Sequence, residues 1–135
     1  MSTCIYKAES GKSVERFIAD LGEVATAQGF IIHNEDKMEM AHTFGAHGVE
    51  VAEGFDLHMV QICKPRKAAK GLSTNPERAV LMPKFIMVFT KDGKTKVRML
   101  VYGRELISEL VDDEEFPGAL EKTFQNLIAA IDAAV

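Results

Sequence analysis

The sequence predicts an α+β domain in which an antiparallel sheet of about five strands carries two main amphipathic helices on one face. Two segments, one early and one late in the chain, have apolar residues at helical spacing. Several short apolar or alternating segments between them are typical of strands. With 135 residues, the chain fits one domain over residues 1–135 and is long enough to bury a core.

Local signals define the first strand and the first helix. Thr3–Ala8 is expected to form a strand. Ser13 is a candidate N-cap, because its hydroxyl can accept a hydrogen bond from a free amide one turn later. Gly29 is expected to end this helix in a left-handed conformation, and Phe30–His33 to form the second strand. The apolar stripe of the helix consists of Val14, Phe17, Ile18, Leu21, Val24 and Ala25.

The segment Asn34–Gly54 carries the weakest pattern. Within it, Met38, Met40 and His42 alternate with other residues, which predicts a half-exposed strand. Two valines in the stretch Val49–Val51 alternate in the same way and are consistent with another strand or a short helix.

The next segments have clearer boundaries. Phe55–Cys63 is expected to be a strand that ends at Pro65, because proline has no amide to donate to a neighbouring strand. Lys67–Leu72 has helix-forming residues, and Thr74–Glu77 is expected to turn into a second short helical piece.

A hairpin and two helices complete the predicted fold. Phe85–Phe89 is the most apolar strand, and Asp92-Gly93 supplies the positive φ angles that a tight hairpin turn requires. The return strand Lys96–Val101 alternates between a polar and a buried face. Glu105–Leu110 is expected to be a short helix, and Pro117 lies near the start of the final one, where its missing amide costs nothing.

Composition narrows the possible functions. The net charge of -4 argues against a broad surface for nucleic acid, and no apolar stretch is long enough to span a membrane. Cys4 and Cys63 form no CxxC pair, so we expect two free thiols in a reducing cytoplasm. Neither nucleic acid nor a membrane is predicted as a partner.

A set of motifs in the middle of the chain resembles the DUF302 family of small bacterial and archaeal domains. The matching residues are Cys63, Pro65, Leu81, Met82, Pro83, Asp92 and Gly93. The resemblance implies a TATA-binding-protein-like fold of one strand, a helix, four strands and a helix, commonly assembled as a homodimer. Where the family commonly has Asn before its proline, this chain has Cys63-Lys64. A fold name gives no licence to infer DNA binding.

The Cys63 thiol is a weak candidate for catalysis. Lys64, Arg66 and Lys67 follow it closely, and nearby cations stabilise a thiolate. The competing interpretation is a small apolar core residue, since free cysteine is among the most buried residue types.

Four methionine and histidine residues form a weak candidate metal site. Met38, Met40, His42 and His58 carry the thioether and imidazole groups that suit Cu(I). No compact ligand motif joins them, and methionine also fills irregular cores without a metal. The prediction is therefore no metal and no cofactor.

The preferred prediction is a binding site for a small ligand or anion. Its candidate residues are Cys63, Lys64, Pro65, Met82, Pro83 and Lys84, which cluster where the family motifs meet several cations. The acidic run Asp112–Glu115 is expected to be solvated at the start of the last helix. Whether the protein is an enzyme stays open: the alternatives are a thiol-dependent enzyme or sulfur or redox carrier using Cys63, and a structural or partner-binding module.

Overall fold

The computed structural model describes residues 1–135 and contains a single five-stranded sheet with the strand order β1-β5-β4-β3-β2. All neighbouring strands are antiparallel. The elements follow in the order β1 (Cys4–Ser10), α1 (Val14–Ala27), β2 (Ile31–Ile32), α2 (Met40–Gly45), β3 (Leu57–Cys63), α3 (Pro65–Thr74), the 3₁₀ helix η1 (Pro76–Leu81), β4 (Lys84–Lys91), β5 (Lys94–Val101), α4 (Arg104–Leu110) and α5 (Phe116–Ala134). The predicted α+β class is confirmed.

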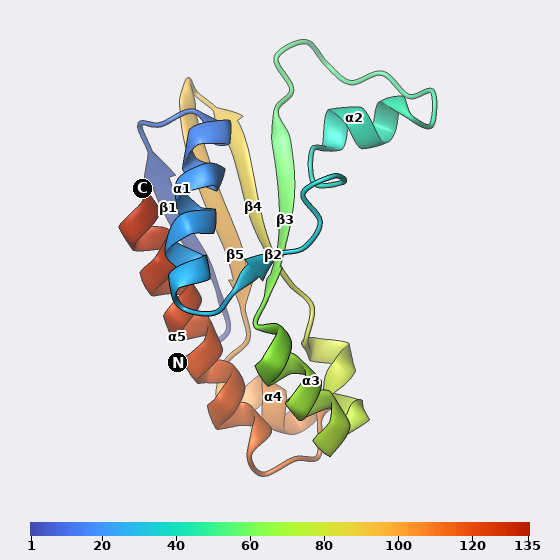
Figure 1. The fold of residues 1–135 in the computed structure, drawn as a ribbon, viewed down its shortest axis with the longest axis vertical. Helices are drawn as coiled ribbons and strands as arrows, with labels where there is room; N and C mark the ends of the chain where they lie inside the picture. Colours follow the sequence, from blue (N-terminus) through green and yellow to red (C-terminus); the bar gives the residue numbers. More distant parts are fainter.

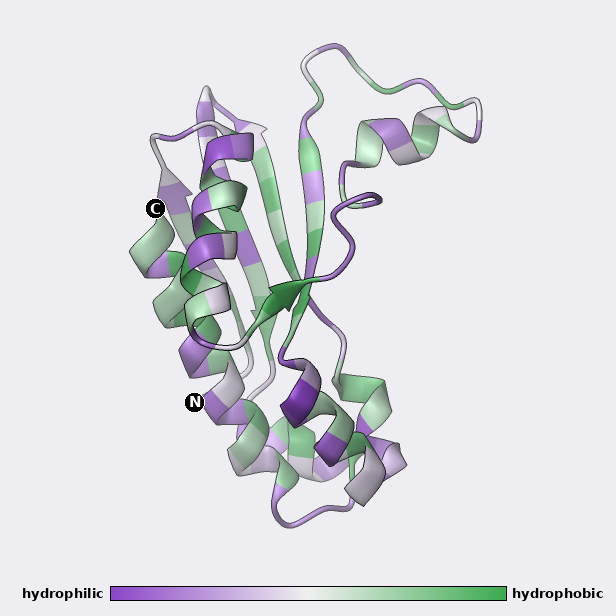
Figure 2. Ribbon diagram, viewed as in Figure 1, coloured by the Kyte–Doolittle hydropathy of each residue, from purple (hydrophilic) through white to green (hydrophobic).

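The two long helices, α1 and α5, lie side by side over one face of the sheet (Figure 1). Their apolar stripes and alternate residues of the central strands form one core, because successive residues of a strand point to opposite faces. In Figure 2 the strands behind α1 are largely hydrophobic, whereas the beginning of α3 is strongly hydrophilic. The largest fully buried side chains of the core include Phe17, Phe30, Phe124, Leu21 and Ile62.

The local signals in the sequence act as expected. The Ser13 hydroxyl accepts a hydrogen bond from the Arg16 amide at 3.1 Å, which caps α1. Gly29 has a φ of 86° just after that helix. Asp92 and Gly93 have φ angles of 55° and 73°, which produce the tight turn between β4 and β5.

The segment Asn34–Gly54 differs from the prediction. Met40 and His42 lie in the short helix α2 and not in a strand, because the Glu39 side chain caps that helix by accepting from the His42 amide. Val49 and Val51 lie in no helix or strand. In Figure 1, α2 lies beside β3 at the edge of the sheet, and the chain that follows α2 loops past the end of that strand.

The opposite end of the molecule positions the candidate site. There α3, η1 and α4 gather beyond the sheet and meet the beginning of α5 (Figure 1). Pro65 is the first residue of α3, where its fixed φ favours a helix and its missing amide is not needed. The chain therefore passes directly from β3 into a helix at the sheet end.

Candidate functional site

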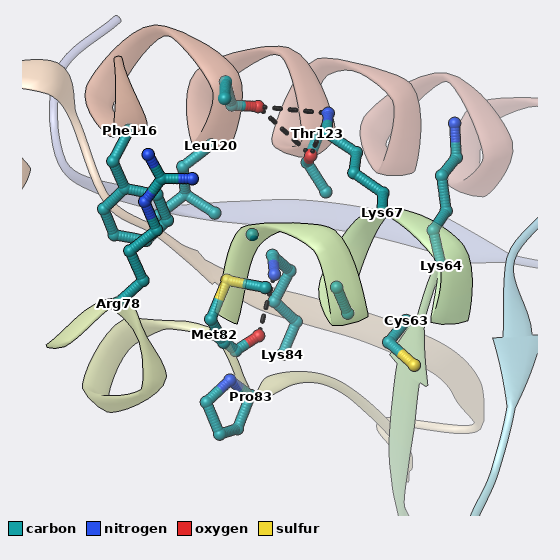
Figure 3. A pocket seen from close by; sticks show the side chains of 13 residues that line it. Cys63, Lys64, Lys67, Arg78, Met82, Pro83, Lys84, Phe116, Leu120 and Thr123 are labelled. Carbon is teal, nitrogen blue, oxygen red and sulfur yellow. Dashed lines mark hydrogen bonds between the residues drawn. The ribbon is translucent and has the colours of Figure 1, made fainter. Parts of the chain in front are cut away.

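A cavity of about 180 Å³ lies between α3, the connection from η1 to β4, and the first turns of α5 (Figure 3). Its lining is mainly carbon, with the polar groups contributed chiefly by lysine and arginine side chains. The lining residues are Cys63, Lys64, Lys67, Ala68, Gly71, Arg78, Met82, Pro83, Lys84, Phe116, Ala119, Leu120 and Thr123.

The structure brings together five of the six residues predicted to bind a ligand. Cys63 and Lys64 contribute from the end of β3, and Met82, Pro83 and Lys84 from the start of β4. These two chain segments are adjacent because β3 pairs with β4, with Ile62 opposite Lys84. Pro65, the sixth, does not line the cavity and instead starts α3.

Lys84 is the most unusual group in the cavity. Its side chain lies on the helix-covered face of the sheet, and the residue is only 6% exposed. The Nζ atom donates one hydrogen bond, to the Met82 carbonyl at 2.7 Å, and no carboxylate lies within ion-pair distance of it. Burial lowers the pKa of Lys84 to about 8, because a charged ammonium is poorly solvated there.

Lys67 is the second cation of the cavity and connects two helices. Its Nζ atom donates to the Thr123 hydroxyl at 3.0 Å and to the Ala119 carbonyl at 3.4 Å, so it joins α3 to α5 (Figure 3). Partial burial lowers the pKa of Lys67, and the positive charge of Lys64 acts in the same direction. Lys64 itself lies over the Phe30 ring, 4.7 Å from its centroid.

Arg78 is buried at the other end of the cavity and is fully paired. Its Nε and Nη2 atoms donate to the two carboxylate oxygens of Asp113 at 2.6 and 3.0 Å. Asn75 donates to the same carboxylate, and the guanidinium lies 5.3 Å from the centroid of the Phe116 ring. The hydrogen bonds from Arg78, which have the largest effect, and from Asn75 hold the pKa of Asp113 well below its usual range.

The prediction that the whole acidic run Asp112–Glu115 is solvated is therefore wrong for one residue. The Asp113 side chain is only 7% exposed and also accepts from the amides of Glu115 and Phe116. It caps the start of α5 while neutralising Arg78. Its neighbours Asp112 and Glu114 are exposed, as expected.

The environment of Cys63 does not favour a thiolate. Burial raises the pKa of its thiol, and the charge of Lys84 opposes that effect only in part. In Figure 3 the sulfur points away from the amines of Lys64 and Lys67, the cations that follow it in sequence. The expectation that these cations lower the pKa of the thiol is therefore wrong.

The methionine and histidine residues of the candidate metal site do not share a strand face. Met38 packs against the core, whereas Met40 and His42 belong to α2. His58 is buried on β3, and its Nδ1 atom lies 3.3 Å from the Asp56 carboxylate without an aligned hydrogen bond. No group of three or more His, Cys, Asp or Glu side chains is arranged to hold a metal ion.

Eight of the 13 residues that line the cavity are not among the residues predicted to bind a ligand. Phe116, Leu120 and Thr123 belong to α5. Lys67 is predicted only as a cation near the Cys63 thiol, and Arg78 is not among the predicted binding residues.

The arrangement is suited to an organic anion. Apolar walls formed by Met82, Phe116 and Leu120 can contact a carbon skeleton, while Lys84 and Lys67 supply positive charge and hydrogen-bond donors. No helix of the molecule has the length and apolar character required to cross a bilayer.

Comparison with known proteins identifies the family. A solved structure described as an uncharacterised conserved DUF302 protein from Bacillus stearothermophilus is similar to this chain, with a TM-score of 0.80 and 18% identity over 97% of this chain and 98% of the other. No curated protein sequence matches. The model of the family described as domain of unknown function DUF302 matches residues 6–134. This chain therefore belongs to the DUF302 family.

Proposed function

We propose that the protein binds a small organic anion, specifically a carboxylate with an apolar body, in the cavity beside Lys84. The observation that carries this proposal is a buried ammonium without a carboxylate partner inside a cavity lined mainly by carbon. Burying an unpaired charge is costly, and an anionic ligand would remove that cost. The cavity thus lacks the negative charge that a ligand would bring.

The size and lining of the cavity support this ligand class. About 180 Å³ is smaller than the 300–1,000 Å³ typical of sites for drug-sized molecules, so the ligand is a small metabolite. The apolar wall favours a carboxylate over a phosphate, because a phosphate dianion costs more to remove from water. Lys67 lies beside Thr123 on the α5 side, where it would give a second contact to the anion.

Binding of 4-ethylbenzoate, compared with its neutral amide, tests the proposal. Two-dimensional NMR of the wild-type protein is expected to show shifts confined to cavity residues such as Met82 and Thr123, and only for the carboxylate. Lys84→Met is expected to abolish the response, whereas Lys70→Met, on the exposed side of α3, is expected to retain it. Equal binding of acid and amide, or no response to a panel of small carboxylates, would refute the proposal.

A second candidate function, partner binding through homodimerisation, is favoured by the open face of the sheet. Ile5 on β1 lies opposite Leu100 on β5, and Phe85 on β4 is next to Ile86, the partner of Met99. Ile5, Leu100 and Phe85 are 57%, 52% and 36% exposed. We propose that a second copy of this chain covers this row, because a two-fold interface requires a self-complementary patch and an apolar row is one.

Sedimentation at several protein concentrations tests the dimer. Wild type is expected to sediment as a dimer and Leu100→Lys as a monomer. Val80→Lys is the matched control, since Val80 is 78% exposed on η1, away from the sheet face. A monomer at all concentrations would refute the dimer without affecting the anion proposal.

We also propose a reducing compartment, the cytoplasm, for this protein. Both of its cysteines, the exposed Cys4 and the half-buried Cys63, are free thiols, and persistent free thiols are typical of reducing compartments. Alkylation at the moment of cell lysis is expected to trap both thiols, and recovery of a mixed disulfide in their place would contradict this assignment.

A further inference from the structure

The Lys84 amine has an environment in which it can act as a nucleophile. An exposed lysine is almost entirely protonated near neutral pH and has no free electron pair. Lys84 is 6% exposed, lines an apolar cavity and has a single hydrogen-bond partner, the Met82 carbonyl. Desolvation of this kind favours the neutral amine, and it is one of the ways in which proteins activate lysine toward carbonyl compounds.

The other cations of the cavity are not equivalent to Lys84. The Arg78 guanidinium is neutralised by Asp113, and arginine does not lose its proton in proteins. Lys67 is more exposed and is held by Thr123 and Ala119 on α5. Lys64 also lines the cavity, but its amine lies over the Phe30 ring. The cavity therefore combines one buried amine, Lys84, with the Lys67 ammonium group held against α5, and these two can serve different functional groups of one ligand.

We propose that Lys84 is a reversible covalent site that forms an imine with the aldehyde or ketone group of a small carboxylate. Once Lys84 is bonded to the carbonyl carbon, the carboxylate is held by Lys67, the second contact of the proposed site. This inference rests on the proposed function, because it assigns the ligand to the carbonyl-containing carboxylates. It also explains why the buried residue at this position is a lysine and not an arginine, which would supply charge but no nucleophile.

The step is a condensation and needs no oxidant or reductant. The electron pair of the neutral Lys84 Nζ attacks the carbonyl carbon, and the carbonyl oxygen takes up a proton as the C–N bond forms. Nitrogen loses one proton to give the neutral carbinolamine, whose hydroxyl group then takes up a second proton and leaves as water while nitrogen forms the C=N bond and releases its other proton. Amine and carbonyl thus become imine and water, and hydrolysis returns both.

Reductive trapping of the wild-type protein tests this inference. The probe is 4-carboxybenzaldehyde with sodium cyanoborohydride, which converts an imine into a stable secondary amine. Intact mass is expected to show one adduct per chain, and peptide mapping is expected to place it on Lys84. At pH 7.5 labelling of Lys84 is expected to exceed that of an exposed lysine such as Lys91 by more than about tenfold, because more of its amine is neutral.

Matched variants and probes separate this inference from the proposed function. Lys84→Arg keeps the positive charge and is expected to lose the adduct, whereas Lys91→Arg is expected to keep it. Benzaldehyde, which has no carboxylate, is expected to label Lys84 more slowly, and Lys67→Met is expected to remove that difference. Since the labelled residue is mapped in wild type, the test also stands if a Lys84 variant fails to fold.

Each outcome has one meaning. Adducts spread evenly over surface lysines, or no adduct while 4-ethylbenzoate still binds wild type, would overturn the imine and leave the anion-binding function intact. Failure of both 4-ethylbenzoate binding and trapping would overturn both. Labelling by benzaldehyde as fast as by 4-carboxybenzaldehyde would overturn the role given to Lys67.

Discussion

The cavity contains two buried cations, Arg78 and Lys84, but only one is neutralised. Arg78 is 8% exposed and shares two hydrogen bonds with Asp113, whose carboxylate also accepts from Asn75. Lys84 is 6% exposed and contacts one carbonyl oxygen, that of Met82. Arg78 and Lys84 are thus similarly buried, but only Arg78 has a carboxylate partner.

This difference teaches that pairing, rather than burial, separates a structural cation from a candidate binding group. The Arg78–Asp113 pair links η1 to the start of α5 and fixes one end of the cavity. Lys84 contributes no ion pair to the fold, so its buried charge is a cost that folding alone does not offset. An anionic ligand can pair with Lys84, whereas Arg78 is already paired with Asp113.

Removing the charge of Asp113 is the strongest way to break the comparison. Asp113→Asn would leave Arg78 buried and unpaired like Lys84, and we expect the melting temperature to fall by about 10 °C. Calorimetry measures this change, and Asp112→Asn is the matched control because Asp112 is exposed. A melting temperature equal to that of the control would show that the pair has no structural role.

The pH dependence of that effect has a definite sign. Because the pKa of Asp113 is lowered on folding, its contribution to stability is fully present above the unfolded value of about 3.9. It is lost as the pH falls through the lower folded value. The destabilisation by Asp113→Asn is therefore expected to be constant from pH 5 to 7 and to shrink in strong acid.

Removing the charge of Lys84 is expected to have the opposite effect. Lys84→Met should raise the free energy of unfolding at pH 7 by about 2 kcal/mol, because it removes an uncompensated buried charge. The folded pKa, about 8, lies below the unfolded value of about 10.4. Between these values the unfolded chain binds more protons, so the Lys84 contribution to stability rises with pH by up to about 1.4 kcal/mol per unit.

Urea unfolding of wild type and Lys84→Met at pH 7, 8, 9 and 10 measures this linkage. The advantage of the variant is expected to be fully present below pH 8 and to shrink as the pH rises toward 10. Subtracting the free energy of unfolding of one protein from that of the other cancels the titration of groups that both share. One such group is Tyr6, whose raised pKa makes stability fall as the pH rises. A pH-independent difference would contradict the titration assigned to Lys84.

Ligand affinity should sharpen the comparison through the same group. Binding of 4-ethylbenzoate to wild type is expected to weaken about tenfold between pH 7 and pH 10, because a charged hydrogen bond becomes a neutral one. Lys67→Met is expected to weaken binding at all of these pH values without removing that dependence. Calorimetric titration measures both effects, and an affinity independent of pH would place the anion away from Lys84.

The smallest expected effect is on the pKa of the Cys63 thiol, which depends in part on the charge of Lys84. The pKa of its thiol is raised by burial and held back by Lys84, so labelling by iodoacetamide is expected to need a pH above the usual 8.5. Lys84→Met should move the labelling midpoint to still higher pH. A midpoint below 8.5 would revive the hypothesis of a reactive thiolate at Cys63.

Local signals made much of the fold predictable. The cap at Ser13, the turn at Asp92-Gly93 and the helix start at Pro65 each depend on residues within a few positions of one another. The α2 helix was missed because the alternation of Met38 and His42 resembles a strand, while the capping Glu39 between them carries the opposite signal.

Only the parts of the candidate site that lie in two short segments of the chain, residues 63–64 and 82–84, were predictable. Cys63, Lys64 and Met82–Lys84 lie in the family motifs that meet when β3 and β4 pair. The contributions of Asp113 and Thr123 could not be found in the same way, because their partners lie 35 and 56 residues away. Such contacts depend on how helices dock, which periodicity does not encode.

The Lys67–Thr123 hydrogen bond has a consequence for the order of folding. Contacts across 56 residues carry a larger closure entropy than a hairpin such as β4–β5, so they form later. A chain still being synthesised has its sheet residues before α5 exists and therefore lacks the wall of the cavity that α5 supplies. Ligand occupancy would thus mark chains that have finished folding, and ligand would selectively stabilise those complete molecules.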